Sequence, residues 1–229
     1  MAIQGKNAAN PCGLASILTK KWRKSSDKKH GSDYYRHPNG GNMVVCVFGA
    51  SSAAIDEIYI NKTYDLGVAL AKRGHTLMFG GGGNGLMGAA ARGFSDVGQH
   101  ITGVAPSFFN VDGVLYEKCD EMVYTDTMRD RKKYMEDNSD AFVVTPGGIG
   151  TYEEFFEVLT LKQLAQLSAP IVLYNVNGFF DKLVKLMEED DKNGFIRKGV
   201  KDLYTVTDSI DEVINHIENA DTSKREIIF

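Results

Sequence analysis

The chain of 229 residues has few of the residues that build disulfide, metal and membrane sites. Its three cysteines, Cys12, Cys46 and Cys119, are widely spaced and odd in number, which argues against a disulfide scaffold and indicates a reducing, cytoplasmic setting. Its five histidines show no HExxH or comparable ligand spacing, so we expect no metal site. No run of about 18 uncharged apolar residues is present, so we expect no transmembrane helix and no membrane partner.

Excess positive charge is confined to the start of the chain. Residues 1–42 carry eight Lys or Arg and two Asp or Glu. The remaining residues carry 18 Lys or Arg and 28 Asp or Glu, which gives them a net charge of −10. An acidic body does not suit a nucleic-acid backbone, so we expect no nucleic-acid partner. The basic segment could bind polyanions or serve in targeting, and we predict that it lies outside the fold, either disordered or not native to the protein. We place one domain at 43–220 and a C-terminal tail at 221–229.

From Met43 onward, short apolar runs alternate with amphipathic segments. The runs predict strands at Met43–Phe48, His75–Phe79, Ile101–Val104, Met122–Tyr124, Asp140–Thr145, Ile171–Tyr174 and Leu203–Val206. The amphipathic segments predict helices at 55–73, Leu86–Val97, Thr127–Asn138, Tyr152–Leu167, 178–191 and 208–219. Such alternation is typical of a parallel sheet covered on both faces and joined by right-handed crossovers. We therefore predict an α/β fold: a single doubly wound, Rossmann-like domain with a mainly parallel sheet.

Two glycine-rich loops follow predicted strands, and the first is Phe79–Ala89. Its Gly83, Gly85 and Gly88 have GxGxxG spacing, where glycine lets a ligand approach the backbone and free helix N–H groups attract anions. A dinucleotide site also needs an acid at the end of the next strand, but that strand ends in Pro106. The loop therefore either binds an anion other than NAD or only permits tight packing of strand on helix.

The second glycine-rich loop is Thr145–Phe155, with three glycines before Thr151. Thr151 stands where a helix N-cap is expected, and Glu154 three residues later completes a capping box, which would give Glu154 a structural role. Alternatively, the glycines leave several N–H groups facing one space, which forms an anion nest. A phosphate bound there would place a sugar near Glu153 and Glu154.

A basic run, Met128–Met135, lies on the predicted helix between these loops. It contains Arg129, Arg131, Lys132 and Lys133 within one and a half turns. Such a run is either a solvated helix face or a partner for the carboxylates and a bound phosphate, a role that suits arginine.

These segments resemble the Lonely Guy (LOG) family, whose motifs are GGGxxGLMG, MxxRKxxM and PGGxGTxxE. The resemblance runs in order from about Val44 to Ile196. The family consists of cytokinin riboside 5′-monophosphate phosphoribohydrolases, often mislabelled lysine decarboxylases. The opening Phe48–Ala53 also resembles the family's first strand and loop, which implies that Ser51 and Ser52 help to hold phosphate.

The resemblance implies that Arg131 and Glu154 are the catalytic pair. With the two glycine loops, it gives this substrate-binding set: Ser51, Gly82, Asn84, Gly85, Lys132, Gly147, Gly148, Gly150, Thr151, Glu153 and Thr160. It also implies a homodimer with the active site at the interface. The chain departs from plant members after the third strand, where an acidic ligand-contacting residue has only Asp112 as a candidate counterpart. The base pocket is expected to include apolar residues of the loop 107–115.

We therefore expect a hydrolase that cleaves the N-glycosidic bond of a cytokinin riboside 5′-monophosphate or AMP-like nucleotide, releasing free base and ribose 5-phosphate without a cofactor. Cleavage builds positive charge on the ribose, which a carboxylate stabilises, and negative charge on the leaving base, which an arginine stabilises. Pyridoxal-dependent decarboxylation is disfavoured because neither glycine loop contains a lysine. A carrier of nucleotide or molybdenum cofactor within the same superfamily is the alternative. A single-strand DNA-binding protein of related fold would need a basic groove.

Overall fold

The computed structural model describes residues 42–223 and 227–228, so the predictions for 1–41 and for part of the C-terminal tail lie outside the described residues. The strands form one seven-stranded sheet in the order β4-β3-β2-β1-β5-β6-β7. All six strand pairings are parallel, which makes the sheet more uniform than the mainly parallel one expected. No described helix is both long and apolar enough to cross a bilayer.

Every predicted strand and helix is present, with shifted ends. The strands are β1 Val44–Phe48, β2 Thr76–Phe79, β3 Ile101–Pro106, β4 Glu121–Thr125, β5 Ala141–Val144, β6 Ile171–Tyr174 and β7 Thr205–Thr207. The helices are α1 Glu57–Lys72, α2 Gly85–Val97, α3 Met128–Asp137, α4 Ile149–Gln163, α5 Asp181–Lys192 and α6 Ile210–Asn219. The doubly wound α/β fold is therefore confirmed.

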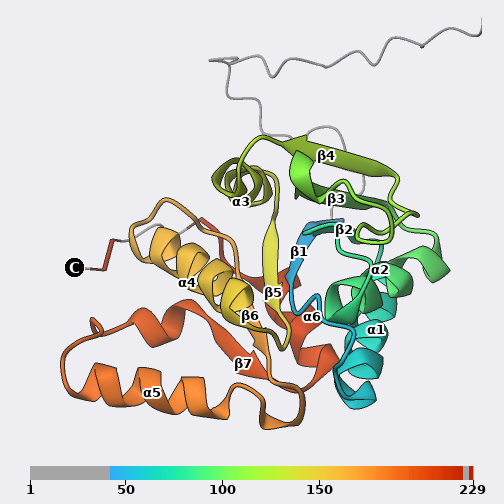
Figure 1. Ribbon diagram of the computed structural model, residues 1–229. Helices are drawn as coiled ribbons and strands as arrows, with labels where there is room; N and C mark the ends of the chain where they lie inside the picture. The colour runs from blue at the N-terminus through green and yellow to red at the C-terminus, as the bar shows by residue number, and fades with distance from the viewer. Residues whose placement is uncertain (1–41, 224–226, 229) are drawn as a thin grey trace, which may run out of the picture.

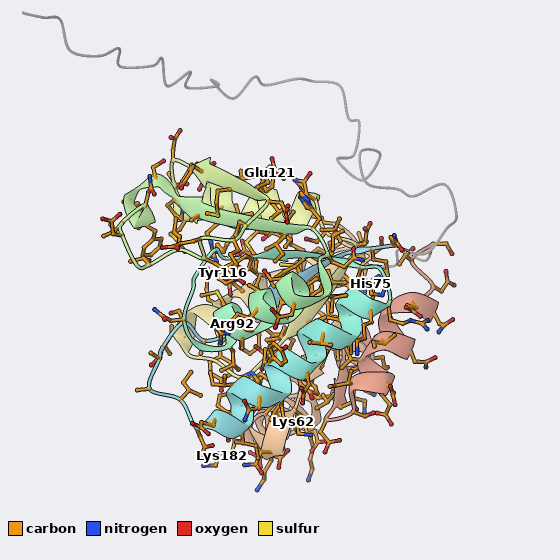
Figure 2. All side chains as sticks on the ribbon, turned by 90° about the vertical axis from the view of Figure 1, so that its right-hand side faces the viewer. Lys62, His75, Arg92, Tyr116, Glu121 and Lys182 are labelled. Atoms are coloured by element: carbon orange, nitrogen blue, oxygen red, sulfur yellow. The ribbon has the colours of Figure 1, made fainter. Side chains whose placement is uncertain are left out.

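Alternate residues of the central strands point to opposite faces and build two apolar cores. Val45 and Val47 of β1 pack with α1, α2 and α6 on one face, whereas Cys46 and Phe48 pack with α3, α4 and α5 on the other. Figure 1 shows α1 and α2 on one side of the sheet and α4 and α5 on the other. In Figure 2 the side of α1 and α2 is turned toward the viewer, and α1, which carries Lys62, and α2, which carries Arg92, lie on the near face. Both faces of the sheet are thus covered.

The strand order reverses between β1 and β5. After β4 at one edge, the chain returns through α3 to place β5 beside β1, with Val45 opposite Ala141 and Phe48 opposite Val144. In open α/β sheets such a switch point leaves a crevice beyond the carboxyl ends of the strands. The loops after β1, β2 and β5 all end there, so both glycine-rich loops lie at one place.

The start of α4 differs from the prediction. Gly148 is the N-cap and Ile149 the first helical residue, so Thr151 lies inside the first turn and the expected N-cap at Thr151 is wrong. Thr145 remains tied to β1, because its N–H and its hydroxyl both donate to the carbonyl of Phe48, at 2.8 and 2.9 Å. The turn that follows is therefore short, and the helix begins earlier than the capping pattern indicates.

Three other boundaries are also shifted. Helix α4 ends at Gln163, short of the expected Leu167, and Ala165 beyond it has a φ of +55°. A short 3-10 turn, Val176–Gly178, precedes α5 and moves its start from 178 to Asp181. A second 3-10 turn, Val200–Leu203, delays β7. All three lie away from the switch point, so they leave the position of the candidate site unchanged.

Candidate functional site

A cavity of about 560 Å³ opens at the switch point, within the range of small-ligand pockets. Its lining comes from the loops after β1, β2, β3 and β5 and from α2, α3 and α4: Gly49, Ala50, Ser51, Ser52, Gly80, Gly82, Asn84, Met87, Phe109, Gly113, Val114, Leu115, Met128, Arg131, Gly148, Gly150, Thr151, Glu153 and Glu154. Segments far apart in the sequence therefore meet around one space.

Arg131 and Glu154 form a buried ion pair in the cavity wall. Arg131 Nη1 donates to Glu154 Oε1 at 2.8 Å, and Arg131 Nε donates to the carbonyl of Val104 at 3.1 Å. The two residues are 6% and 9% exposed, so the pair is held largely away from water. A Cβ at Gly80 would lie 2.0 Å from Arg131 Nη2, so only glycine at this position lets the guanidinium lie where it does. Strand, loop and helix together orient this pair.

Burial of Glu154 raises the pKa of its carboxyl, because the charged form loses solvation. The charge and the hydrogen bond of Arg131 act in the opposite direction and favour the carboxylate. Burial raises the pKa of the Cys46 thiol in β1 well above the usual range, and the charge of Glu154 adds to this effect. Cys46 does not line the cavity, so of these two groups only the paired carboxylate of Glu154 reaches it.

The N-termini of α2 and α4 both face the cavity, but they differ in their hydrogen bonding. The N–H groups of Leu86 and Met87 in α2 donate to the carbonyl of Ala50, at 2.8 and 3.3 Å. The N–H groups of 149–151 in α4 have no partner among the residues that the structure describes. Because free N–H groups at a helix start attract anions, α4 is the end that can bind a phosphate.

Lys132 and Glu153 lie directly beside the Arg131–Glu154 pair. The Lys132 ammonium forms ion pairs with the carboxylates of Glu153 and, at 2.5 Å, Glu157. Burial acts to lower the pKa of Lys132, but the hydrogen bonds that its ammonium donates to Glu153 and Glu157, together with the charges of the two carboxylates, outweigh burial and raise that pKa. Lys132 does not line the cavity.

One part of the cavity wall is apolar. Phe109, Val114 and Leu115 of the loop after β3 lie in it, within the segment 107–115 that was expected to contribute apolar residues. An antiparallel bridge between Gly82 and Leu115 ties this loop to the first glycine loop. The cavity thus has both polar and apolar parts in its wall.

The structure gathers most of the predicted residues but not all. Those lining the cavity are Ser51, Gly82, Asn84, Arg131, Gly148, Gly150, Thr151, Glu153 and Glu154. Those outside its lining are Gly85, Lys132, Gly147 and Thr160. Thr160 is on an exposed face of α4, and its hydroxyl donates to the Phe156 carbonyl at 2.7 Å. Asp112, the candidate counterpart of the acid in plant members, is exposed and also lies outside the lining.

The structure bears on three alternatives that the sequence left open: the role of Glu154, the role of the glycines after β2 and the role of the basic run on α3. Glu154 bonds to Arg131, so the capping-box role does not apply. Gly85 and Gly88 are needed for packing, because a Cβ at either would meet a backbone oxygen at 2.4 and 2.0 Å. In the basic run, Arg129 is solvated, whereas Arg131 is buried.

Sequence reasoning missed several contributors. The carbonyl of Val104 holds Arg131, but a backbone group leaves no pattern in a sequence. Met87 and Met128 line the cavity, although methionines in helices usually mark a core. Gly80 belongs to the glycine run Gly80–Gly83, and this run is the sequence pattern from which its role beside Arg131 could have been suspected.

Comparison with known proteins is consistent with this geometry. The family described as "Possible lysine decarboxylase" matches residues 87–217. A rice protein, "Probable cytokinin riboside 5'-monophosphate phosphoribohydrolase LOG4", is 32% identical over 81% of this chain and 80% of its own length. The Arabidopsis "Cytokinin riboside 5'-monophosphate phosphoribohydrolase LOG2" is 32% identical over 76% of this chain and 82% of its own. The chain belongs to the LOG family.

The fold is also found outside the named hydrolases. The molybdenum cofactor (Moco) carrier protein of Chlamydomonas reinhardtii aligns with 78% of this LOG-family chain and 97% of its own at a TM-score of 0.58. Its sequence identity is 22%, so the likeness establishes a shared fold and nothing about the ligand.

Proposed function

We propose that the protein is a nucleoside 5′-monophosphate phosphoribohydrolase. It hydrolyses the N-glycosidic bond of a cytokinin riboside 5′-monophosphate or AMP-like nucleotide to free base and ribose 5-phosphate. The observation that carries the proposal is the buried Arg131–Glu154 pair in a cavity with an anion-binding helix start at one end and an apolar wall at another. The names of the LOG relatives support the same reaction class.

The phosphate binds at the start of α4. Gly148 and Gly150 have nothing within 4 Å of an added Cβ, so a ligand can approach their backbone closely. The N–H groups of 149–151 and the hydroxyl of Thr151 then bind the phosphate oxygens, with Ser51 on the facing loop. Because Glu154 is one turn further along α4, a bound phosphate brings the ribose beside its carboxylate. Binding at the phosphate thereby positions the bond to be broken.

Bond cleavage follows from the charges of the pair. As the C1′–N bond breaks, its electron pair goes to the base and positive charge develops on the ribose. The Glu154 carboxylate stabilises that charge and orients water, whose oxygen bonds to C1′ while one of its protons passes to the departing base. Arg131 holds the carboxylate ionised and in place and stabilises negative charge on the leaving group. The step requires no metal or redox group.

Activity should fall in acid because the carboxylate must be ionised. Burial raises the pKa of Glu154, so the acid limb of kcat/KM lies above the ordinary glutamate range. As pH falls through this raised pKa, the ionised fraction and the rate fall together. A pH–rate profile measures the limb.

The active site is completed in a homodimer. Exposed apolar side chains lie on the segment between β3 and β4 and on β4, α3 and α4: Phe108, Phe109, Val111, Tyr124, Met128 and Ile149. Phe109 and Met128 also line the cavity, and a second copy that covers these side chains removes apolar surface from water. Mass measured in solution by light scattering tests the dimer. The free thiols of Cys46 and Cys119 agree with a cytoplasmic location.

The deciding experiment is release of free base from a panel of nucleotides. The panel contains AMP, isopentenyl-AMP, GMP, CMP and their 5′-dephosphorylated nucleosides, each given to wild type, Glu154→Gln and Arg131→Ala. Losing either group should raise the barrier by about 2–4 kcal/mol. The matched control is Arg129→Ala, which removes an exposed arginine two residues away on α3 and should retain activity.

The outcome separates the enzyme from a carrier. Base released only from monophosphates and lost in Glu154→Gln supports the hydrolase and identifies its base. If wild type releases no base but binds nucleotides or molybdenum cofactor, the protein is a carrier of the same superfamily. Near wild-type turnover in a folded Glu154→Gln variant would contradict the assignment of Glu154.

A further inference from the structure

Asn84 occupies a helix N-cap position, but its side chain does not cap the helix. It precedes Gly85, the first residue of α2, and its carboxamide accepts no hydrogen bond from the helix. An asparagine at an N-cap usually accepts a hydrogen bond from the second or third N–H of the helix. In α2 these N–H groups belong to Leu86 and Met87, and both donate to the carbonyl of Ala50. That carbonyl takes the place of the cap, so the Asn84 carboxamide has no structural role at the helix start.

Asn84 is also one of the residues that line the cavity. Its carboxamide forms no hydrogen bond to any other residue that the structure describes. The charged side chains of the lining are, in contrast, already paired: Arg131 with Glu154, and Glu153 with Lys132. A carboxamide offers an acceptor and two donors on neighbouring atoms, so the free one of Asn84 can bind a ligand at two points.

Asn84 follows the part of the first glycine loop that is joined to the apolar part of the cavity wall. The N–H of Gly83 donates to the carbonyl of Val114 at 3.0 Å, and Gly82 forms an antiparallel bridge with Leu115. Val114 and Leu115 both line the cavity. The proposed phosphate site at the start of α4 follows β5, and β1 lies between β5 and β2 in the sheet. Asn84 is therefore beside the apolar part of the wall, away from the phosphate end, where the base of a nucleotide would lie.

We propose that Asn84 is a specificity-determining residue that recognises an adenine base with at least one hydrogen on N6. Its Oδ1 accepts the N6–H and its Nδ2 donates to N7, the pairing by which asparagine recognises adenine. One alkyl group on N6 leaves one N–H for this bond, so AMP and N6-alkylated AMP both fit. The inference rests on the proposed function, because it names the base that the same site accepts.

A 6-oxo purine cannot make both hydrogen bonds. Its O6 would oppose Oδ1 of Asn84, and a carboxamide turned by 180° would donate to O6 but place Oδ1 against N7. An adenine with two alkyl groups on N6 has no N–H to donate. A site built around a hydrogen bond rejects an analogue that lacks the matching group. Asn84 therefore selects against GMP, IMP and N6,N6-dimethyl-AMP.

The first test compares the dissociation constants of AMP and IMP with and without Asn84→Leu. The full chain carries Glu154→Gln throughout, so that turnover does not consume the ligand. Leucine has nearly the shape of asparagine but no polar side-chain atom, and we expect the preference for AMP over IMP to fall about 10- to 100-fold. The ratio of kcat/KM for the two nucleotides, measured with Glu154 intact, should fall in the same way.

Two controls separate base recognition from a general disturbance of the site. Because the Asn84 side chain caps nothing, the urea midpoint of unfolding should be the same with and without Asn84→Leu. Ser51→Ala removes a hydroxyl that we place at the phosphate. It should weaken AMP and IMP equally and leave the preference between them unchanged.

Asn84→Asp provides a readout that a merely structural role would not change. Aspartate keeps an acceptor for the N6–H but presents a second acceptor to N7, so AMP should bind about tenfold more weakly. In 7-deaza-AMP a C–H replaces N7, which removes that repulsion. The chain with Asn84 should therefore prefer AMP to 7-deaza-AMP, and the chain with Asn84→Asp should prefer 7-deaza-AMP.

Three results would overturn the inference. If Asn84→Leu weakens AMP and IMP equally, the carboxamide does not distinguish the bases. If Asn84→Leu instead removes a preference for AMP over 2′-deoxy-AMP, Asn84 binds the ribose. If the chain binds neither AMP nor IMP, there is no base for Asn84 to recognise.

Binding and base release distinguish this inference from the proposed function. A protein that prefers AMP over IMP through Asn84 but releases no base from any nucleotide retains the inference and refutes the hydrolase. A protein that releases base, with the same preference in Asn84→Leu as in wild type, retains the hydrolase and refutes the inference.

Discussion

The two glycine-rich loops resemble one another in composition but differ in what surrounds their glycines. After β2, a Cβ at Gly85 or Gly88 would lie 2.4 or 2.0 Å from a backbone oxygen. After β5, a Cβ at Gly148 or Gly150 would meet nothing within 4 Å. The first loop therefore needs glycine so that the fold can close, whereas the second has glycine where space is open and where we propose that the ligand binds.

The helices that follow the loops differ in the same way. The N-terminal N–H groups of α2 are bonded to the Ala50 carbonyl, whereas those of α4 are open to the cavity. Ala50 also donates its own N–H to the carbonyl of Pro146, at 3.1 Å, and so ties the two loops together. One loop is fixed by contacts within the fold, and the other is the proposed anion site.

The largest expected effect is the loss of stability in Gly85→Ala. Gly85 has a φ of +60°, and its Cβ would press on the carbonyls of Ala50 and Ser52. The left-handed backbone and the collision together should cost about 2–5 kcal/mol in the free energy of unfolding, measured by urea denaturation. The control is Gly98→Ala, where φ is +81° but space is open, so only about 1–2 kcal/mol is lost. Equal losses would show that packing does not constrain this loop.

A smaller effect is expected for Gly80→Ala, because its clash is with a side chain and not with backbone. The new methyl displaces the Arg131 guanidinium, which should reduce kcat/KM about 100-fold. The loss should depend on Arg131: in an Arg131→Ala background, Gly80→Ala should have no further effect on the rate. If the two losses add in full, Gly80 acts on activity by another route.

The smallest effect is expected for Gly150→Ala, which tests the open loop. Alanine in the first turn of α4 should stabilise the fold by about 0.5–1 kcal/mol. The methyl nevertheless occupies space beside the proposed phosphate, so KM for the monophosphate should rise about tenfold. The dephosphorylated nucleoside serves as the control, and its binding should not change. A KM that stays constant for the monophosphate would place the phosphate elsewhere.

Sequence patterns predicted the fold well because they are local. Seven short apolar runs, such as Ile171–Tyr174, specify buried strands, and the amphipathic segments between them specify helices on both faces. Element ends were less predictable where a tertiary contact acts on them. Helix α4 begins at Ile149 and not at Tyr152, in a turn that follows Thr145, which is bonded to Phe48 far away in the sequence.

The candidate site was predictable in part. Arg131 and Glu154 stand out by motif, and the structure pairs them at 2.8 Å. The motif does not distinguish Lys132 from Arg131, yet one faces two carboxylates outside the cavity and the other lines it. The direction of a side chain depends on which helix packs beside it, and a linear pattern does not contain that information.

By itself, the sequence determined the alternation of strands and helices, the glycine loops at strand ends and the residue types needed for glycosidic chemistry. Only the tertiary structure decided which glycines support the fold and which have open space beside them, and which helix start keeps its N–H groups free. The physical reason is that these properties depend on contacts between segments such as Ala50 and Leu86, or Gly80 and Arg131, which the chain brings together only on folding.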